Sequence, residues 1–295
     1  MSDRCPHRFA PLSKGRIEGD LVHCGYHGLA FDRTGQCVAN PNGAVPKSVR
    51  TRVYVAVERY GAIWIWLGEP ELADADLIPD LSFISQAPGT ARLQGCMYTR
   101  ANYQLLSDNI LDLSHADQLH KETLGALPKG FKMAVDDKPD GVAVRWAADN
   151  VPITPSMRVM MPGTEMVDSW LQVRWFAPAI MILTSDNQPA GHRPNDEDFP
   201  IALHSMTPET ATTTHYFWAF VRRRDVENVA VNEKMREIIE FAFLKEDKPM
   251  IEAQQAAMET DDLWSLKPAL LAVDRAAVVA RRKLERLIEQ EAGTP

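Results

Sequence analysis

The distribution of hydrophobic and polar residues divides the chain into two regions of different character. Residues 1–70 are rich in Gly, Pro and β-branched residues, and strand-like runs occur at residues 52–58 and 62–67. The dipeptide Tyr60-Gly61 lies between these runs and predicts a β-hairpin. The following stretch, residues 68–79, contains Pro and Asp and is typical of a linker.

Strands and helices are mixed in the rest of the chain. Apolar and aromatic runs predict strands at residues 142–146, 171–175 and 215–221. Helices are expected near residues 107–121, 231–244 and 268–291, the last of them as a charged amphipathic helix on the surface. Because strands and helices do not alternate regularly, the order favours the α+β class over a parallel sheet of β-α units.

Length and composition are those of a globular protein with two domains. With 295 residues the chain exceeds the usual size of one domain, and we place the domains at residues 1–80 and 81–295. A hydrophobic content of 45% and a charged content of 24% are ordinary. The net charge of −8 argues against nucleic acid as a partner.

The sequence also predicts the cellular location. No apolar stretch approaches the roughly 20 residues that span a bilayer, so we expect no membrane association. No signal peptide precedes the first cysteine, Cys5. We expect a cytoplasmic protein in which the two spare cysteines, Cys37 and Cys96, are reduced thiols.

Two short motifs near the start of the chain carry the strongest chemical signal. Cys5-Pro6-His7 is followed, sixteen residues later, by Cys24-Gly25-Tyr26-His27. Two Cys and two His in this arrangement suit a Rieske [2Fe-2S] centre, in which the two Cys hold one iron and the two His hold the other. Because neutral imidazoles replace negatively charged thiolates, such a cluster is easier to reduce.

A Cys2His2 zinc site is the alternative, since its ligand types are the same. Zinc sites usually place two Cys in one motif and two His in another. Here each motif combines one Cys with one His. This mixture favours two irons that each draw on both motifs, and we therefore predict that Cys5, His7, Cys24 and His27 hold a Rieske cluster.

A second motif indicates a mononuclear metal. Asp112, His115 and His120 follow an Asp-x2-His-x4-His spacing. On one continuous helix the two His would lie about 140° apart around the axis, so both can bind one ion only if the helix bends or ends between them. Two His and a distant carboxylate form the facial triad of non-haem Fe(II) oxygenases. Histidines of the surface or the core are the alternative interpretation.

Together these motifs resemble the oxygenase component of Rieske non-haem iron oxygenases, most closely the vanillate O-demethylase and dicamba monooxygenase subgroup. The segments that carry the resemblance are residues 5–12, 24–31, 109–120, 207–210, 215–217 and 246–248. The resemblance implies an α+β fold. An N-terminal all-β Rieske domain (1–80) would precede a catalytic domain (81–295) of an antiparallel sheet with helices, which is helix-grip-like.

Family members carry several strands before the first Cys-x-His motif, whereas this chain reaches the motif at Cys5. We therefore expect a Rieske domain whose N-terminal strands are missing.

The resemblance also implies the third ligand of the mononuclear iron. Asp247 stands where the family places its carboxylate, late in the catalytic domain. Glu246 and Glu252 are rivals, because either offers a hard oxygen ligand. The implied cofactors are a Rieske [2Fe-2S] cluster and a mononuclear Fe(II) held by His115, His120 and Asp247, with O2 as co-substrate.

Electron supply and assembly are implied in the same way. The family takes electrons from an NAD(P)H-dependent reductase with a flavin and a ferredoxin-type centre, or through a separate ferredoxin. Its subunits assemble head to tail, most often as a homotrimer. Asp112 would bridge a Rieske His of one subunit to an iron-ligating His of the next, supported by Asn109. The alternative for Asp112 is a carboxylate at a helix N-terminus.

The subgroup implies O-demethylation of a methoxylated aromatic acid such as vanillate. Hydroxylation of the methyl carbon would give a hemiacetal that collapses to a phenol and formaldehyde. An anionic substrate needs a hydrogen-bond donor, for which His204 and Arg174 are candidates, although polar residues are more often satisfied within the protein. We expect His215 to be structural and His192 to be solvated.

Two other functions stay open at this point. An aromatic-ring hydroxylating (di)oxygenase would use the same irons, because regiochemistry depends on the shape of the pocket. A Rieske electron-transfer protein without its own catalysis needs only the first motif. That interpretation leaves Asp112, His115 and His120 unexplained.

Overall fold

The computed structural model describes residues 1–45, 47–125, 127, 130–191 and 199–293. His192, expected to be solvated, lies outside the described residues. The chain divides into two compact units, Met1–Pro79 and Asp80–Pro295, and each is described by itself.

The first unit is built on a small antiparallel sheet in the order β1-β2-β3-β4. The strands are β1 (Arg16–Glu18), β2 (Leu21–His23), β3 (Ala30–Phe31) and β4 (Cys37–Ala39). One core cluster lies against this sheet, and its buried members are Cys5, Leu12, Cys24, Leu29, Phe31 and Cys37. Both predicted cysteine ligands therefore belong to the core of this unit.

A separate hairpin, β5 (Val55–Arg59) and β6 (Ala62–Trp66), follows in the same unit. Its two-residue loop consists of Tyr60 and Gly61, which both have positive φ (59° and 75°). Such a loop is the primed turn that matches the twist of the strands, and the predicted hairpin is confirmed. The segment expected to be a linker contains two 3-10 turns, Pro70–Leu72 and Ala75–Leu77.

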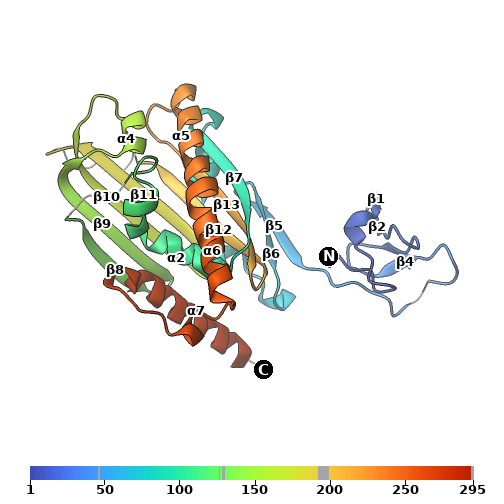
Figure 1. Ribbon diagram of the computed structural model, residues 1–295. Helices are drawn as coiled ribbons and strands as arrows, with labels where there is room; N and C mark the ends of the chain where they lie inside the picture. The colour runs from blue at the N-terminus through green and yellow to red at the C-terminus, as the bar shows by residue number, and fades with distance from the viewer. Residues whose placement is uncertain (46, 126, 128–129, 192–198, 294–295) are drawn as a thin grey trace. The chain divides into compact units, whose positions relative to one another are not determined.

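The second unit contains a seven-stranded antiparallel sheet in the order β7-β13-β12-β11-β10-β9-β8 (Figure 1). Its strands are β7 (Arg92–Thr99), β8 (Lys132–Lys138), β9 (Gly141–Pro152), β10 (Met166–Phe176), β11 (Ile180–Pro189), β12 (Ile201–Thr210) and β13 (Thr213–Val221). The three strands predicted in this part of the chain lie within β9, β10 and β13.

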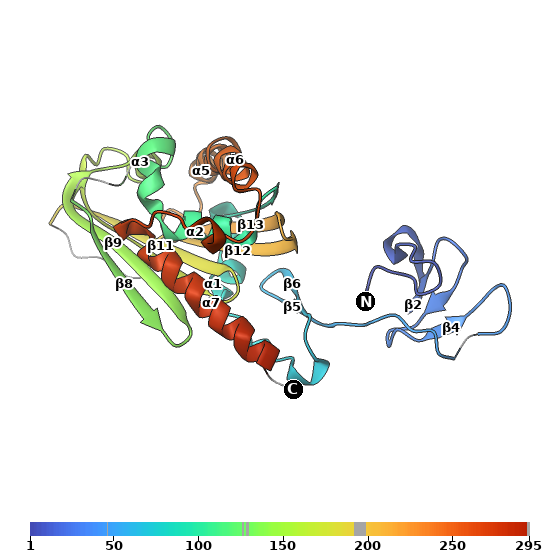
Figure 2. The same ribbon diagram turned by 60° about the horizontal axis from the view of Figure 1, so that its bottom comes forward.

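Helices lie across one face of this sheet, as Figures 1 and 2 show for α2, α5 and α6. The helices of the unit are α1 (Ser82–Gln86), α2 (Tyr103–Leu111), α3 (Ala116–Leu119), α4 (Pro155–Met160), α5 (Val229–Phe241), α6 (Lys248–Met258) and α7 (Arg275–Gly293). The α+β, helix-grip-like fold expected from the sequence is confirmed. Within the described residues, no helix combines the length and the apolar character that a membrane span requires.

Two predicted helices differ from the observed ones. The last helix, expected from about residue 268, begins at Arg275, because Lys267 has a left-handed conformation (φ 52°) and Pro268 follows it. The helix expected near residues 107–121 is interrupted, since α2 ends at Leu111 and α3 begins at Ala116. This second difference forms the metal site described below.

Candidate metal centres and substrate cavity

Two loops with the same backbone hydrogen bonds carry the four predicted Rieske ligands. The N–H of Phe9 donates to the carbonyl of Cys5 (2.8 Å), and the N–H of Gly28 donates to that of Cys24 (3.0 Å). In both loops the Cys N–H also donates to the carbonyl five residues further along the chain. Phe9 and Gly28 occupy equivalent positions and both have positive φ (60° and 76°). The two motifs therefore fold as matching turns.

These turns bring like side chains together. The thiols of Cys5 and Cys24 interact with each other. The rings of His7 and His27 lie 4.6 Å apart between centroids. Both thiols are buried, whereas the imidazoles are nearer the surface. Pairing of Cys with Cys and of His with His fits a cluster in which each pair holds one iron.

Backbone N–H groups stabilise negative charge on one of the sulfurs. Burial by itself would raise the pKa of Cys24, but hydrogen bonds from the N–H groups of Tyr26 and His27, together with the Cys5 thiol, lower it below its ordinary value. The pKa of Cys5 is raised, chiefly by burial and by the neighbouring Cys24. Hydrogen bonds of this kind tune the properties of a bound cluster.

The mononuclear site begins where α2 ends. Asp112 has an extended conformation (φ −125°, ψ 97°), and its side chain accepts a hydrogen bond from the N–H of Ser114 (2.9 Å). Asp112 thus caps the next turn, Leu113–His115, and stops the helix. The interruption that the spacing of the two histidines required lies at this residue.

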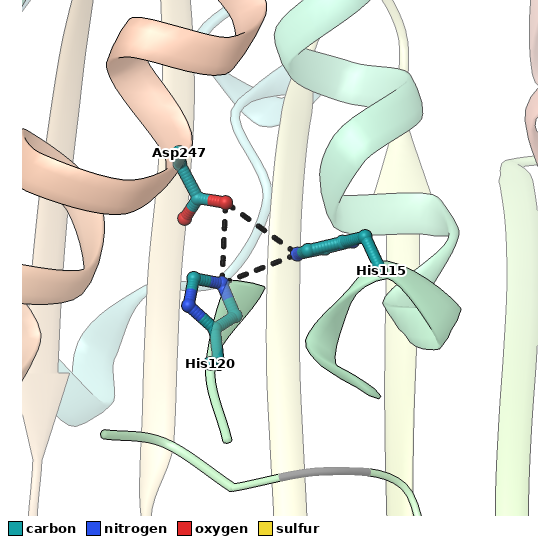
Figure 3. A group of neighbouring side chains, drawn as sticks. All are labelled: His115, His120 and Asp247. Carbon is teal, nitrogen blue, oxygen red and sulfur yellow. Dashed lines mark hydrogen bonds and ion pairs between the residues drawn. The ribbon is translucent and has the colours of Figure 1, made fainter. Parts of the chain in front are cut away.

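Beyond the interruption, three side chains converge (Figure 3). The Nε2 atoms of His115 and His120 are 3.2 Å apart. Asp247 Oδ1 lies 3.2 Å from Nε2 of His120 and 3.5 Å from Nε2 of His115. Donors that each bind one ion at about 2.1 Å and at right angles lie about 3 Å apart, so these three atoms fit a single ion. The ligand assignment stays a prediction, and the geometry agrees with a facial triad.

Both rings are oriented through their other nitrogen. His115 Nδ1–H donates to the backbone carbonyl of Asp112 (2.6 Å), and His120 Nδ1–H donates to Glu246 Oε2 (2.8 Å). With the proton on Nδ1, each ring keeps the lone pair of Nε2 for a metal. Glu246, a rival for the third ligand, therefore contacts the side of His120 that is turned away from Asp247.

The other rival, Glu252, points elsewhere. Its carboxylate accepts a hydrogen bond from the N–H of Arg100 (2.9 Å) and one from the guanidinium of the same residue (3.2 Å). Asp247 ends a π-helical segment, Ala242–Asp247, between α5 and α6. Such segments are frequent at functional sites. Of the three acidic candidates, Asp247 alone meets Nε2 of both histidines in this structure.

The carboxylates of Asp247 and Glu246 lie beside His120 and favour a cation at this site. Burial by itself would lower the pKa of this histidine, but hydrogen bonds and charge from Asp247 and Glu246 raise the pKa above its ordinary value. Asn109, in the last turn of α2, donates from Nδ2 to Asp247 Oδ1 (3.2 Å). The prediction had Asn109 supporting Asp112; in the structure its amide contacts the carboxylate of the metal site instead.

A cavity of about 180 Å³ opens beside the three side chains. Its walls are mainly apolar, with Leu171, Leu183, Trp218, Phe220 and Phe243 among them. Polar side chains come from three neighbouring strands, namely Ser169 of β10, Ser185 and Asn187 of β11, and His204 of β12. The cavity therefore suits a largely apolar molecule with a few hydrogen-bonding groups.

His204 provides a neutral donor in this cavity. The ring is 3% exposed, and burial lowers its pKa to about 4, so it is neutral at pH 7. Its Nδ1 lies 2.5 Å from the hydroxyl of Tyr216, whose own pKa is raised by burial, so that the O–H is retained. When this O–H donates to Nδ1, the imidazole proton sits on Nε2. Nε2 has no partner among the described residues.

Arg174, the other predicted substrate contact, does not line the cavity. On β10, Ser169 and Leu171 face the cavity, whereas Arg174 belongs to the opposite set of alternating positions. Its guanidinium lies 3.6 Å from Asp140 and over the ring of Phe176. The prediction for Arg174 was therefore wrong.

Other polar residues of the strands either agree with the expectation from the sequence or were not identified from it. His215 lies 3.7 Å from Glu209 and against the ring of Tyr98, in keeping with the structural role expected for it. Sequence reasoning missed Ser169 and Asn187 in the cavity wall, and Tyr216, whose hydroxyl contacts His204. The signal for Asn187 was the polar run at residues 185–188, which is unusual inside a buried strand.

Comparison with known proteins assigns both parts of the chain to known domain families. Residues 1–54 match the Rieske [2Fe-2S] domain, and residues 99–290 match the vanillate O-demethylase oxygenase C-terminal domain. The chain is 35% identical to the oxygenase component of chloroacetanilide N-alkylformylase of Rhizorhabdus wittichii, over 98% of this chain and 84% of the relative. It is also 35% identical to the oxygenase component of dicamba O-demethylase of Stenotrophomonas maltophilia, over 99% and 87%.

Solved structures give the same picture. A crystal structure of dicamba monooxygenase bound to 3,6-dichlorosalicylic acid matches with a TM-score of 0.89 and 32% identity, over 99% of this chain and 86% of that chain. Fold, paired motifs and metal-site geometry together define a Rieske-type oxygenase. The chain belongs to the Rieske non-haem iron oxygenases that carry the vanillate O-demethylase C-terminal domain.

This membership establishes an oxygenase and excludes one of the functions that the sequence left open. The protein is a Rieske-type non-haem iron monooxygenase, and its cofactors are a [2Fe-2S] cluster and a mononuclear iron, with O2 as co-substrate. A Rieske electron-transfer protein without its own catalysis is excluded, because the oxygenase domain match covers most of the chain.

Proposed function

We propose that this monooxygenase O-demethylates a methoxylated aromatic acid. The observation that carries the proposal is the apolar cavity beside His115, His120 and Asp247, in which His204 presents a neutral N–H. The names of the dicamba O-demethylase relative and of the matching C-terminal domain support this substrate class.

The overall reaction consumes one O2 and two electrons from NAD(P)H. When bound, the cluster delivers single electrons and the mononuclear iron activates O2. One oxygen atom enters a C–H bond of the methoxy group to give a hemiacetal. The bond between the aryl oxygen and the former methyl carbon then breaks, and the hydroxyl proton passes to the aryl oxygen, which releases formaldehyde and the phenol. The second oxygen atom leaves as water. Because the relatives are named as oxygenase components, we propose a separate reductase as the electron donor.

The protein's own groups position the substrate. The apolar walls exclude water and hold the aromatic ring, since burial of apolar surface stabilises binding. Nε2–H of His204 donates to an oxygen of the acid, and Ser169 and Asn187, which are directly opposed on β10 and β11, offer further hydrogen bonds. None of the described lining residues is Lys or Arg. The acid is therefore held by neutral donors rather than by an ion pair.

Asp112 fits a role between subunits in the proposed head-to-tail homotrimer. Its Oδ1 caps the turn that carries His115, and its carbonyl orients the ring of that histidine. No hydrogen bond from another described residue occupies Oδ2 of Asp112. This oxygen is available to a Rieske histidine of a neighbouring subunit. The contact with His115, which was expected from the carboxylate, is made by the backbone carbonyl of Asp112 instead.

Product analysis tests the proposed function. The purified protein, a family reductase and NADH are incubated with methoxybenzoates, with methoxybenzenes that lack the acid, and with benzoates that lack the methoxy group. We expect equimolar formaldehyde and phenol from the methoxybenzoates and much slower turnover of the neutral ethers. Formation of cis-dihydrodiols without formaldehyde would instead establish the ring-hydroxylating alternative.

A further inference from the structure

The side chain of Glu246 makes two hydrogen bonds that the triad itself does not explain. Its Oε2 accepts a hydrogen bond from Nδ1 of His120 (2.8 Å) and another from the hydroxyl of Thr123 (2.7 Å). The Glu246 side chain is 16% exposed and that of His120 only 3%. A carboxylate so poorly hydrated depends on these donors.

The two hydrogen bonds join segments far apart in the sequence. His120 and Thr123 belong to the turn after α3, in which the N–H groups of Thr123 and Gly125 both donate to the carbonyl of His120. Glu246 belongs to the π-helical segment Ala242–Asp247. That segment presents Asp247 to Nε2 of His120 and Glu246 to Nδ1 of the same ring. The imidazole is thus held from both sides by consecutive residues.

The two histidines of the site are not held alike. Nδ1 of His115 donates to a neutral backbone carbonyl, that of Asp112, whereas Nδ1 of His120 donates to a carboxylate. Hydrogen bonds to ionised acceptors are roughly twice as strong as neutral ones. A carboxylate behind an imidazole also makes the opposite nitrogen a better metal ligand.

We propose that Glu246 is a positioning residue for the mononuclear site and not a metal ligand. Its carboxylate, fixed by the Thr123 hydroxyl, keeps His120 in the tautomer with the proton on Nδ1 and aims Nε2 at the ion. This inference rests on the proposed ligand set of His115, His120 and Asp247. By this proposal, the hydrogen-bonded pair of Glu246 and Thr123 contributes part of the affinity of the site for iron.

Metal binding, measured without turnover, tests the inference. The full chain with its cluster is freed of mononuclear iron by a chelator, and Fe(II) or Co(II) is titrated anaerobically against a competing chelator. The variants are Glu246→Ala, Glu246→Gln, Thr123→Val and Asp247→Ala. Glu252→Gln is the matched control, because this glutamate lies on α6 and pairs with Arg100. Cluster absorbance and the thermal midpoint of the metal-free protein report on folding.

We expect Glu246→Ala to raise the dissociation constant for the metal about 10–100-fold, as loss of an outer carboxylate typically does. Glu246→Gln, whose amide oxygen still accepts one hydrogen bond, and Thr123→Val should cause smaller increases. Glu252→Gln should bind like the parent, and Asp247→Ala should not bind at concentrations that saturate the parent.

Three other results would overturn the inference, each in a distinguishable way. If Glu246→Ala binds the metal like the parent and Asp247→Ala does not bind it, the proposed ligand set stands and Glu246 has no positioning role. Parent-like binding by Asp247→Ala means that the proposed ligand set is wrong. Complete loss of binding in both Glu246→Ala and Glu246→Gln makes Glu246 a ligand itself.

Discussion

At the scale of single residues, hydrogen bonds decide which nitrogen of each histidine is free. The spacing of His115 and His120 predicted a shared metal, but no sequence pattern contains the Asp112 carbonyl or the Glu246 carboxylate behind the rings. Asp247 lies far along the chain, so spacing alone could not select it, and family resemblance was needed. The fold, not the local sequence, brings Asp247 to the two histidines.

Removal of either histidine should separate the two metal centres. We expect His115→Ala and His120→Ala to abolish turnover, because a facial triad that loses one ligand no longer holds its ion. The visible absorbance of the Rieske cluster should persist, since Cys5 and Cys24 belong to another compact unit. Absorbance and iron content of the purified variants decide the matter. Equal loss of both metals would argue against independent sites.

His204 predicts a specific pH dependence of stability. Its folded pKa is about 4, below the ordinary 6.5. Between these values the unfolded chain binds a proton that folded His204 does not, so stability falls as pH is lowered through this window, by about 1.4 kcal/mol per unit. Gln does not titrate and can still accept from Tyr216. Between pH 6.5 and pH 5, the free energy of unfolding of His204→Gln should therefore fall by about 2 kcal/mol less than that of the parent.

Urea denaturation of both proteins at pH 6.5 and pH 5 measures this difference. A surface control, His215→Gln, should behave like the parent, because this histidine is partly exposed. Identical pH dependence of the parent and His204→Gln would show that burial does not lower the pKa of His204 in the folded state.

At the scale of elements, the structure departs from the expected helices and strands at the segments that carry the metal site. Strand and hairpin predictions succeeded where apolar runs and turn residues decide the outcome. The helix expected near residues 107–121 is interrupted because Asp112 supplies a cap that competes with helix continuation. The π-helical segment Ala242–Asp247 has no sequence signature of comparable strength. Local patterns predict regular elements, whereas irregular ones depend on tertiary contacts.

Strand β7 should control the size of the cavity. Gly95 is directly opposite Trp218 of β13, and a Cβ at Gly95 would lie 2.5 Å from the indole ring. Because Trp218 lines the cavity, Gly95→Ala should push the indole toward the substrate. We expect a higher KM for bulky ring-substituted methoxybenzoates than for unsubstituted ones, with a stability loss of about 1–3 kcal/mol from overpacking.

Steady-state kinetics with the two substrates, and thermal melting, check this prediction. Gly89→Ala is the matched control, since no atom lies within 4 Å of a Cβ built there. If Gly95→Ala changes KM equally for both substrates, cavity size is not governed by Trp218.

At the scale of the whole molecule, function depends on electron transfer between two sites. The predicted Rieske ligands lie in Met1–Pro79, and the predicted ligands of the mononuclear iron lie in Asp80–Pro295. The sequence predicted the four Rieske ligands and the two histidines from residue types at fixed spacings, whereas Asp247 was predicted only from the family resemblance. The assembly stays a prediction from the family, since a surface that pairs with another subunit carries no comparable motif. The proposed bridge through Asp112 would connect the Rieske centre of one subunit to the mononuclear site of the next.

Asp112→Asn isolates this bridge from the local structure. Asn caps a helical turn as well as Asp does, so the turn that carries His115 should persist. The amide offers one acceptor oxygen instead of two, and Oδ1 is already used by Ser114. Both metals should therefore load, light scattering should show an unchanged assembly, and the reductase should reduce the cluster at the parent rate. Reoxidation of the reduced cluster with substrate and O2 should be about 10–100-fold slower.

Stopped-flow absorbance of the cluster measures that last step. Asp136→Asn, which changes an exposed carboxylate of β8, is the control and should reoxidise like the parent. Slow reoxidation confined to Asp112→Asn would support a carboxylate whose second oxygen accepts a hydrogen bond from a Rieske imidazole of a neighbouring subunit, because neither metal content nor assembly would have changed. Unchanged reoxidation would reduce Asp112 to a helix cap, and electrons would then have to reach the triad by another contact.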